Sequence, residues 1–168
     1  TDLTRVMPIT EQLPHGGSSD DIHFSPDGKM LLVASNDMAV RVWDATTGTR
    51  LLSPLQHGHD VEMVRASADG QRLVTACKDG AARVWSTEDG QLLMTLRHNK
   101  PVNWAMFDPN CRRVLTGSMI GGVLELTGAD IHVWDLSIVQ VAAENTMRHG
   151  AGLQTVAVSP DGTLVATG

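Results

Sequence analysis

The sequence predicts an all-β protein made of repeated four-stranded antiparallel sheets, with about three and a half such units in its 168 residues. Tryptophan recurs at positions 43, 85 and 134, and histidine recurs at 15, 57, 98 and 149. A turn of the type Ser-Pro-Asp-Gly recurs in the same register, at 25–28, 67–70, 108–111 and 159–162. Independent landmarks that keep one register over a period of about 40–45 residues indicate a structural repeat.

Each unit contains four short apolar segments, a to d, which are separated by turn residues. In the second unit these segments are VEMVRA, RLVTAC, AARVW and QLLMTL, at residues 61–66, 72–77, 81–85 and 91–96. Asp-Gly pairs lie between them, as expected for tight turns that need a positive φ. The first unit gives strands at 21–25, 30–35, 39–44 and 49–55, and the third at 102–107, 113–118, 131–136 and, more weakly, 140–144.

The repeat makes the chain a single domain that consists of repeat units of unequal length. An isolated outer strand is expected at 9–13, followed by full units at 14–55, 56–96 and 97–145 and a partial unit at 146–168. The third unit carries an insertion at 120–130 (IGGVLELTGAD) between its second and third strands. Both ends of the chain fall inside this pattern, which favours a piece of a longer chain.

Composition narrows the class of partner. A formal net charge of −6 with interspersed acidic and basic residues argues against nucleic acid as a partner. There is no apolar run of 18 residues and no signal peptide, so no membrane contact is expected. Cys77 and Cys111 have no spacing typical of disulfides or zinc, which favours two core thiols in a cytoplasmic, reducing compartment.

Repeats of about 40–45 residues with four strands and a Trp-Asp exit are typical of propeller blades. The sequence resembles the WD40-repeat β-propeller family, in the style of its bacterial members, over about residues 9–168. Trp43-Asp44 and Trp134-Asp135 match the family dipeptide, whereas Trp85-Ser86 departs from it in the second member. The resemblance implies an all-β propeller and a protein-binding role, and it implies that the rest of a longer chain, often with an enzyme domain, can accompany such repeats.

The resemblance also implies a hydrogen-bonded structural tetrad in each blade: histidine before strand a, Ser or Thr on strand b, Asp in the b–c turn and Trp on strand c. The second unit matches completely, whereas the first has Val33 in place of the Ser or Thr. In the third unit, which has His98, Thr116 and Trp134, the insertion makes Asp130 only a possible fourth member. The expected members are His15, Asp37, Trp43, His57, Thr75, Asp79, Trp85, His98, Thr116, Asp130, Trp134, His149 and Thr167.

Candidate partner-binding residues fall into three groups, each with a structural alternative. Arg41 and Arg83 lie two residues before a tryptophan and form either a basic row for an acidic partner or ordinary strand residues. Trp104 on strand a either packs between blades or forms a ligand platform at the channel mouth. The insertion places Val123, Leu124, Glu125 and Leu126 in an apolar flap that either binds a partner or packs on its neighbour.

No catalytic residue, metal site or cofactor is expected. Histidines that recur beside Asp and Thr resemble a catalytic triad, but an active site is needed once and a scaffold contact in every blade. His57 and His59 have no further ligand cluster nearby in the sequence. The sequence therefore favours a non-enzymatic protein–protein interaction scaffold, with a small-ligand-binding or catalytic propeller that uses the channel mouth as the alternative.

The sequence does not decide how a propeller ring would be completed. About three and a half blades are fewer than most propellers contain, and propellers close to remove unpaired sheet edges. The chain either forms part of a larger ring, pairs with a second copy that completes the ring, or closes alone as four blades. Partner identity is not fixed by the fold.

Overall fold

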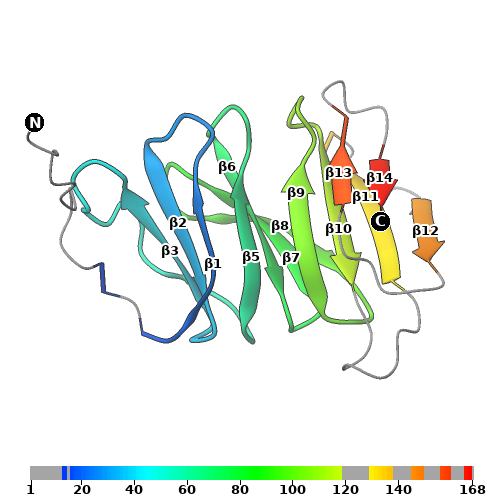
Figure 1. Ribbon diagram of the computed structural model, residues 1–168, viewed down its shortest axis with the longest axis horizontal. Helices are drawn as coiled ribbons and strands as arrows, with labels where there is room; N and C mark the ends of the chain where they lie inside the picture. Colours follow the sequence, from blue (N-terminus) through cyan, green and yellow to red (C-terminus); the bar gives the residue numbers. More distant parts are fainter. Residues whose placement is uncertain are drawn as a thin grey trace, which may run out of the picture.

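The computed structural model describes residues 13–14, 16–118, 129–137, 145–149, 156–159 and 165–167, and all of its regular elements are β-strands. Three four-stranded antiparallel sheets and one two-stranded sheet follow one another along the chain (Figure 1). Sheet 1 contains β1 (Ser19–Phe24), β2 (Met30–Ser35), β3 (Ala39–Asp44) and β4 (Leu55–Gln56). Sheet 2 contains β5 (Val61–Ala66), β6 (Arg72–Cys77), β7 (Ala81–Ser86) and β8 (Leu92–Arg97).

Sheet 3 contains β9 (Val102–Phe107), β10 (Arg113–Ser118), β11 (Ala129–Asp135) and β12 (Asn145–His149), and the two-stranded sheet pairs β13 (Val156–Val158) with β14 (Val165–Thr167). In each four-stranded sheet every strand pairs with the next one along the chain. This meander confirms the expected all-β fold class of four-stranded antiparallel units. The three sheets stand face to face in a row, and they do not close into a ring.

The turns between first and second strands have the conformation that their sequence predicts. Gly28 and Gly70 have φ values of 72° and 71°, in the left-handed region where glycine has no steric penalty. Cys111 occupies the same position in the third unit with a φ of 57°. The Ser67 hydroxyl donates to Asp69 Oδ1 at 2.5 Å, and the Ser25 hydroxyl donates to Asp27 Oδ1 at 2.6 Å. The turn is therefore fixed by local side-chain hydrogen bonds.

Two outer strands differ from the sequence expectation. In the first unit a strand was expected at 49–55, but only Leu55 and Gln56 form β4, and Trp43 makes an isolated bridge with Arg50. Pro54 has no N–H to donate to a strand ladder, and it precedes the short strand. In the third unit the outer strand is β12 at 145–149, five residues later than the expected 140–144, which lie outside the described residues.

The register explains the position of β12. Asp130 pairs with Arg148, so His149 follows one residue beyond that pair, as His98 follows the pair Ala81 with Arg97. The number of residues from the outer strand to the histidine is therefore the same in the second and third units. The number of residues from the tryptophan to the outer strand is larger in the third unit. β11 begins at Ala129, so the last two residues of the predicted insertion belong to a strand, and residues 119–128 lie outside the described residues.

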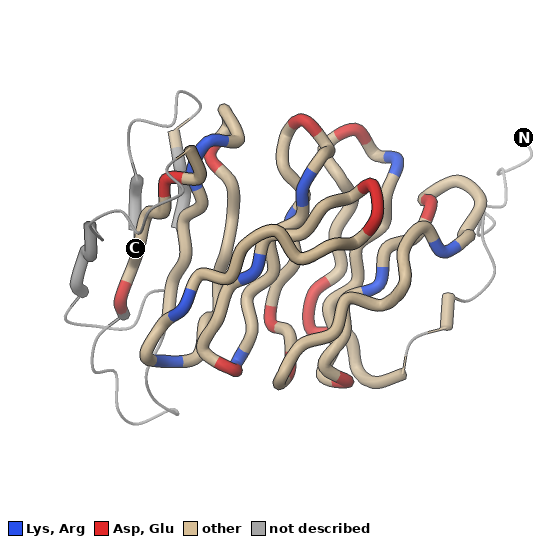
Figure 2. Tube along the Cα trace, turned by 180° about the vertical axis from the view of Figure 1, so that it is seen from behind, with Lys and Arg blue, Asp and Glu red and all other residues tan. Residues whose placement is uncertain are grey.

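The core lies between the sheets. One cluster joins the second and third strands of sheet 1 to sheet 2 through Leu32, Ala34, Val40, Val42, Leu52, Leu55, Val61, Val64, Leu73 and Trp85. A second cluster joins sheet 2 to sheet 3 through Val74, Ala76, Ala82, Val84, Leu96, Val102, Ala105 and Val114. Acidic and basic residues are interspersed along the described chain and do not gather on one face (Figure 2).

Candidate functional site

The most complete polar arrangement lies in sheet 2 and connects three of its four predicted members. His57 Nδ1 is 3.0 Å from the carbonyl oxygen of Leu55, which can only accept, so this nitrogen carries the proton. His57 Nε2 then accepts from the Thr75 hydroxyl at 2.8 Å, and Trp85 Nε1–H donates to Thr75 Oγ1 at 3.1 Å. The chain of hydrogen bonds ties the loop before β5 to β6 and β7.

The fourth predicted member, Asp79, bonds elsewhere. Its carboxylate accepts two hydrogen bonds from the Arg83 guanidinium, at 3.1 and 2.7 Å, and one from the N–H of Gly58 at 3.1 Å. No hydrogen bond joins it to His57, although the family resemblance implied a direct connection. A bidentate arginine is a better donor pair than one imidazole N–H, and His57 has already used its proton on Leu55.

Sheet 1 repeats the carboxylate–arginine pair and lacks the hydroxyl. Asp37 accepts two hydrogen bonds from Arg41, at 3.1 and 2.6 Å, in the same register as the pair in sheet 2. Val33 occupies the place of Thr75, and the buried Nε1 of Trp43 meets no acceptor among the described residues. His15, the expected histidine of this unit, lies outside the described residues.

Sheet 3 retains the hydrogen bond between tryptophan and threonine but not the one between threonine and histidine. Trp134 Nε1–H donates to Thr116 Oγ1 at 2.7 Å, but His98 does not bond to that hydroxyl. Both ring nitrogens of His98 are buried and meet no hydrogen-bond partner in the described part of the chain. Its ring instead lies edge-on against the ring of His132, with centroids 4.7 Å apart, and His132 occupies the register position of Arg83.

The assignment of Asp130 to the turn of the third unit was wrong. Asp130 pairs in register with Ser118, as Ala81 pairs with Cys77, so it lies on a strand and not in the b–c turn. The insertion changes the number of residues between the second and third strands, so the turn position could not be counted from the repeat. Its carboxylate accepts from Lys100 Nζ at 2.8 Å, which fastens the base of the insertion to the loop before β9.

The last two predicted members are placed only by register. His149 ends β12, and Thr167 lies in β14, where it pairs with Val156 as Thr75 pairs with Val64. Thr167 therefore lies on the second strand of its unit, as the repeat predicts, whereas His149 lies in an outer strand and not in the loop before the first strand.

Burial sets the protonation of His57 and His98. Burial of the ring lowers the pKa of His57 to about 4, and burial together with the nearby His132 lowers the pKa of His98 to about 4. Burial alone would raise the pKa of Asp79, but the hydrogen bonds from Arg83 and the sulfur of Cys77 outweigh it and lower the pKa to about 2. At neutral pH His57 and His98 are therefore uncharged and Asp79 is ionised.

The two basic residues predicted to bind a partner already form ion pairs within the protein. The Arg41 and Arg83 guanidinium groups are mostly buried, and each is bound by the aspartate of its own repeat. Their charge is therefore neutralised inside the protein, which favours the structural alternative over a basic row for an acidic partner. Val123, Leu124, Glu125 and Leu126 lie outside the described residues, so their role stays a prediction.

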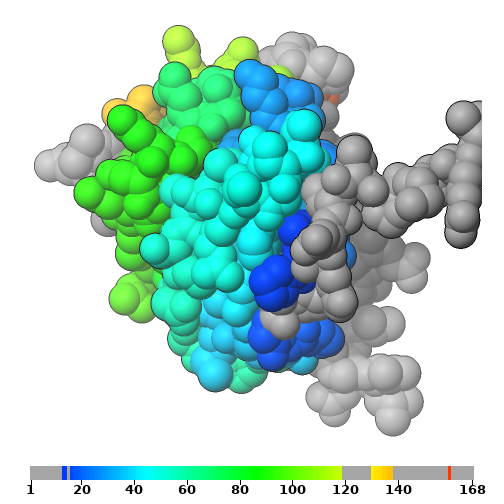
Figure 3. Space-filling view, turned by 90° about the vertical axis from the view of Figure 1, so that its left-hand side faces the viewer, coloured from blue at the N-terminus to red at the C-terminus, as the bar shows by residue number. Residues whose placement is uncertain are grey.

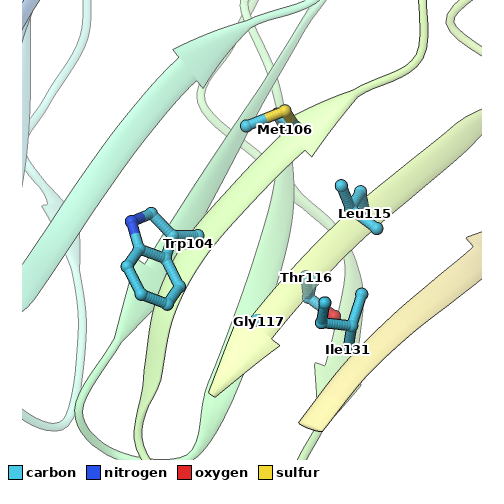
Figure 4. Close-up of a pocket in the computed structure, with 6 residues that line it drawn as sticks. All are labelled: Trp104, Met106, Leu115, Thr116, Gly117 and Ile131. Carbon is cyan, nitrogen blue, oxygen red and sulfur yellow. The ribbon is translucent and has the colours of Figure 1, made fainter. Parts of the chain in front are cut away.

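Trp104 lies on the face of sheet 3 that points away from sheet 2. A Cβ added to Gly117 would lie 3.0 Å from Trp104 Cε3, so the indole ring rests on the glycine. Around it is a small apolar hollow lined by Trp104, Met106, Leu115, Thr116, Gly117 and Ile131 (Figure 4). This position suits contact with another sheet, the interblade alternative, more than a platform at a channel mouth.

Two contacts between sheets were not foreseen. Asp21 on β1 accepts hydrogen bonds from Arg65 and from the N–H of Val64 at 3.0 Å, which joins sheets 1 and 2. Arg72 of sheet 2 donates to the carbonyl of Cys111 at 2.5 Å. The repeat pattern carried no signal for the Asp21 contact, since the other units have Met63 and Trp104 in that place.

Among the described residues, no group of three or more His, Cys, Asp or Glu side chains is placed to hold a metal ion. None of these residues forms a helix of the length and apolarity that crossing a membrane requires.

Comparison with known families gives one match. The family model described as "WD domain, G-beta repeat" matches residues 9–44 and 50–86. These two segments correspond to the first and second units of the repeat. No curated protein matches the chain significantly.

Proposed function

Because the chain belongs to the WD40-repeat family, we propose that it is a non-enzymatic scaffold that recruits another protein to its loops. WD40 repeats generally serve as protein-interaction modules and are typically without enzymatic activity. The observation that supports this role is the repeated internal use of polar side chains. In sheet 2 the groups that resemble a catalytic triad are consumed by hydrogen bonds within the sheet, and the aspartate–arginine pair recurs in the same register in sheet 1.

The proposed binding surface is the insertion between β10 and β11. Its sequence places Val123, Leu124 and Leu126 between glycines, in a segment that the other units do not have. The described residues on either side are well fixed, because Ser118 is buried in β10 and Asp130 is held by Lys100. A variable loop on a rigid support is the usual arrangement for recognition.

A cytoplasmic location is proposed with it. Cys77 and Cys111 are both buried and are not joined to each other or to another described cysteine. Buried free thiols are compatible with a reducing compartment.

The test is partner capture by the tagged chain in a lysate of its source organism, with cross-linking and mass spectrometry. Deletion of residues 121–128 is expected to remove the captured protein without lowering the melting temperature. The matched control is Asp89→Ala, in the exposed turn before β8, which is expected to retain the captured protein. Capture that survives the deletion contradicts the proposed surface, and hydrolytic or transferase turnover that depends on a single histidine contradicts the non-enzymatic role.

A further inference from the structure

A histidine follows the outer strand of sheets 1 and 2, at the point where the chain passes to the next sheet. The N–H of His57 donates to the carbonyl of Met38 at 2.8 Å, and the N–H of His98 donates to the carbonyl of Gly80 at 2.8 Å. Figure 3 views the molecule from sheet 1 and shows its outer segment in cyan beside the green of sheet 2, where the first of these connections passes. The backbone of the two connections is therefore held in the same way.

The side chains of the two histidines are held differently. Each nitrogen of the His57 ring has a hydrogen bond, one with the carbonyl of Leu55 at 3.0 Å and one with the hydroxyl of Thr75 at 2.8 Å. Both ring nitrogens of His98 are buried and have no hydrogen-bond partner among the described residues. Moving the His57 ring out of its sheet therefore breaks two hydrogen bonds, whereas moving the His98 ring breaks none in the described chain and gives both nitrogens access to water.

The ring of His98 contacts two aromatic rings of sheet 3. It lies edge-on against His132, with centroids 4.7 Å apart and an angle of 88°, and its centroid is 5.5 Å from that of Trp134. His132 in turn stacks on Trp134, at 5.7 Å and 24°. Because the backbone of His98 is bonded to sheet 2 and its ring packs on sheet 3, these three rings join the two sheets at this end of their interface.

A proton on His98 works against this packing. Burial and the neighbouring His132 both disfavour the charged ring, and Asp130 of β11 favours it more weakly. The carboxylate of Asp130 is bound to Lys100 of the same loop as His98. The turn between β6 and β7, which contacts this loop, carries charges that are already paired within sheet 2, Lys78 with Asp60 and Glu62, and Asp79 with Arg83.

We propose that the His98–His132 pair is a pH-sensitive switch between sheets 2 and 3. When the pH falls, His98 takes up a proton, its ring leaves the two aromatic rings, and the loop at 98–101 opens locally. The corresponding loop at His57 stays closed under the same conditions, because its ring has two hydrogen bonds to lose. The switch is independent of the proposed recruitment function and can be tested without a partner.

The size of the effect follows from the pKa of His98 in the two forms. The pKa is about 4 for the packed ring and about 6.5 for a ring in water, so the open form binds the proton more tightly. The stability of the closed form is fully present above pH 6.5 and is lost as the pH falls towards 4. Between pH 7 and pH 5 the ratio of open to closed loop should rise about 20-fold.

The experiment is amide hydrogen exchange of the full chain at pH 7 and pH 5, expressed as protection factors so that the intrinsic pH dependence of exchange cancels. The N–H of His98 is expected to be less protected than the N–H of His57 at both pH values. Its protection should fall about 20-fold between pH 7 and pH 5. In an NMR titration the indole N–H of Trp134, which lies against both imidazole rings, should shift with the same midpoint as the ring of His98.

Two matched variants identify the group that takes up the proton. His98→Gln should abolish the pH dependence of protection at position 98 and leave exchange at position 57 unchanged. His57→Gln removes the histidine of the same repeat position in sheet 2 and should leave the pH dependence at position 98 intact. His132→Gln removes the ring on which His98 packs, so it should lower the protection at position 98 already at pH 7.

Three results overturn the switch: protection at position 98 that is the same at pH 7 and pH 5, a pH dependence there that survives His98→Gln, or equal loss of protection at positions 57 and 98 in the unaltered chain. The last result would mean that the whole fold opens in one step. Melting curves show whether each variant is folded. If His98→Gln does not fold, the NMR titration of the unaltered chain decides, because a His98 midpoint at or above pH 6.5 contradicts a ring that is neutral because it is packed.

Discussion

Replacing Val33 by threonine should stabilise the protein, although it places a polar group in the interior. The Nε1–H of Trp43 is buried and has no acceptor among the described residues. At the same register position Thr75 and Thr116 each accept from the tryptophan of their own sheet, at 3.1 and 2.7 Å. A threonine at position 33 would supply the missing acceptor with the geometry that the other two sheets already show.

The expected gain follows from the two groups involved. An unsatisfied buried donor costs about 1–3 kcal/mol, and a hydrogen bond contributes about 0.5–1.5 kcal/mol net. The new hydroxyl also needs an acceptor for its own proton. The carbonyl of Arg41 provides one, as the carbonyl of His132 does for Thr116 at 3.4 Å. We expect the free energy of unfolding to rise by about 1 kcal/mol and the melting temperature by about 2–4 °C.

The assay is urea unfolding of the full chain, followed by tryptophan fluorescence, with hydrogen exchange of the Trp43 indole as a local readout. Val42→Thr is the matched control, because Val42 is buried among apolar residues that face sheet 2. It should lower the free energy of unfolding by about 1–3 kcal/mol. If both substitutions destabilise the protein equally, or if the Trp43 indole exchanges at an unchanged rate, the unsatisfied donor is not a source of instability.

Two further predictions concern sheet 2. Asp79→Ala should lower the free energy of unfolding by about 1–3 kcal/mol, because it leaves Arg83 and the N–H of Gly58 without their acceptor, whereas Asp89→Ala in an exposed turn should change it little; equal melting temperatures would contradict the assigned role. His57 stabilises the fold only when neutral: its pKa is about 4 in the folded chain and about 6.5 unfolded, so stability should be complete above pH 6.5 and decrease as the pH falls towards 4. His57→Gln should reduce this slope in urea titrations at several pH values, and an unchanged slope would show that His57 is not buried as neutral imidazole.

The strands were predictable because each strand position recurs in several units, so that the sequence signals of the units can be compared. The first three strands of each of the three full units fall within two residues of their expected bounds, since apolar alternation, the turn and the tryptophan agree. The hydrogen bonds from the two tryptophans to Thr75 and Thr116 followed from the family pattern, and the unsatisfied Trp43 followed from Val33. A residue type at a fixed register is enough to predict a contact within one sheet.

Competition among side chains was not predictable in the same way. The pattern placed Asp79 near His57 but could not show that Arg83, two residues before the tryptophan, reaches the carboxylate first. Spacing gives proximity, whereas the choice of partner depends on the rotamers and on the number of donors each group offers. Asp130 failed for a different reason: the insertion removed the reference point from which turn positions are counted.

The three sheets differ in completeness, and this difference bears on where the fold yields first. Sheet 2 has its histidine, threonine, tryptophan and carboxylate all paired and is covered on both faces. Sheet 1 lacks an acceptor for its tryptophan, and sheet 3 leaves His98 buried without a hydrogen bond in the described part of the chain. In a repeat array each unit is stabilised by itself and by its neighbours, and sheet 2 packs against a sheet on each of its faces. We therefore expect sheets 1 and 3, with their unsatisfied buried polar groups, to open locally before sheet 2.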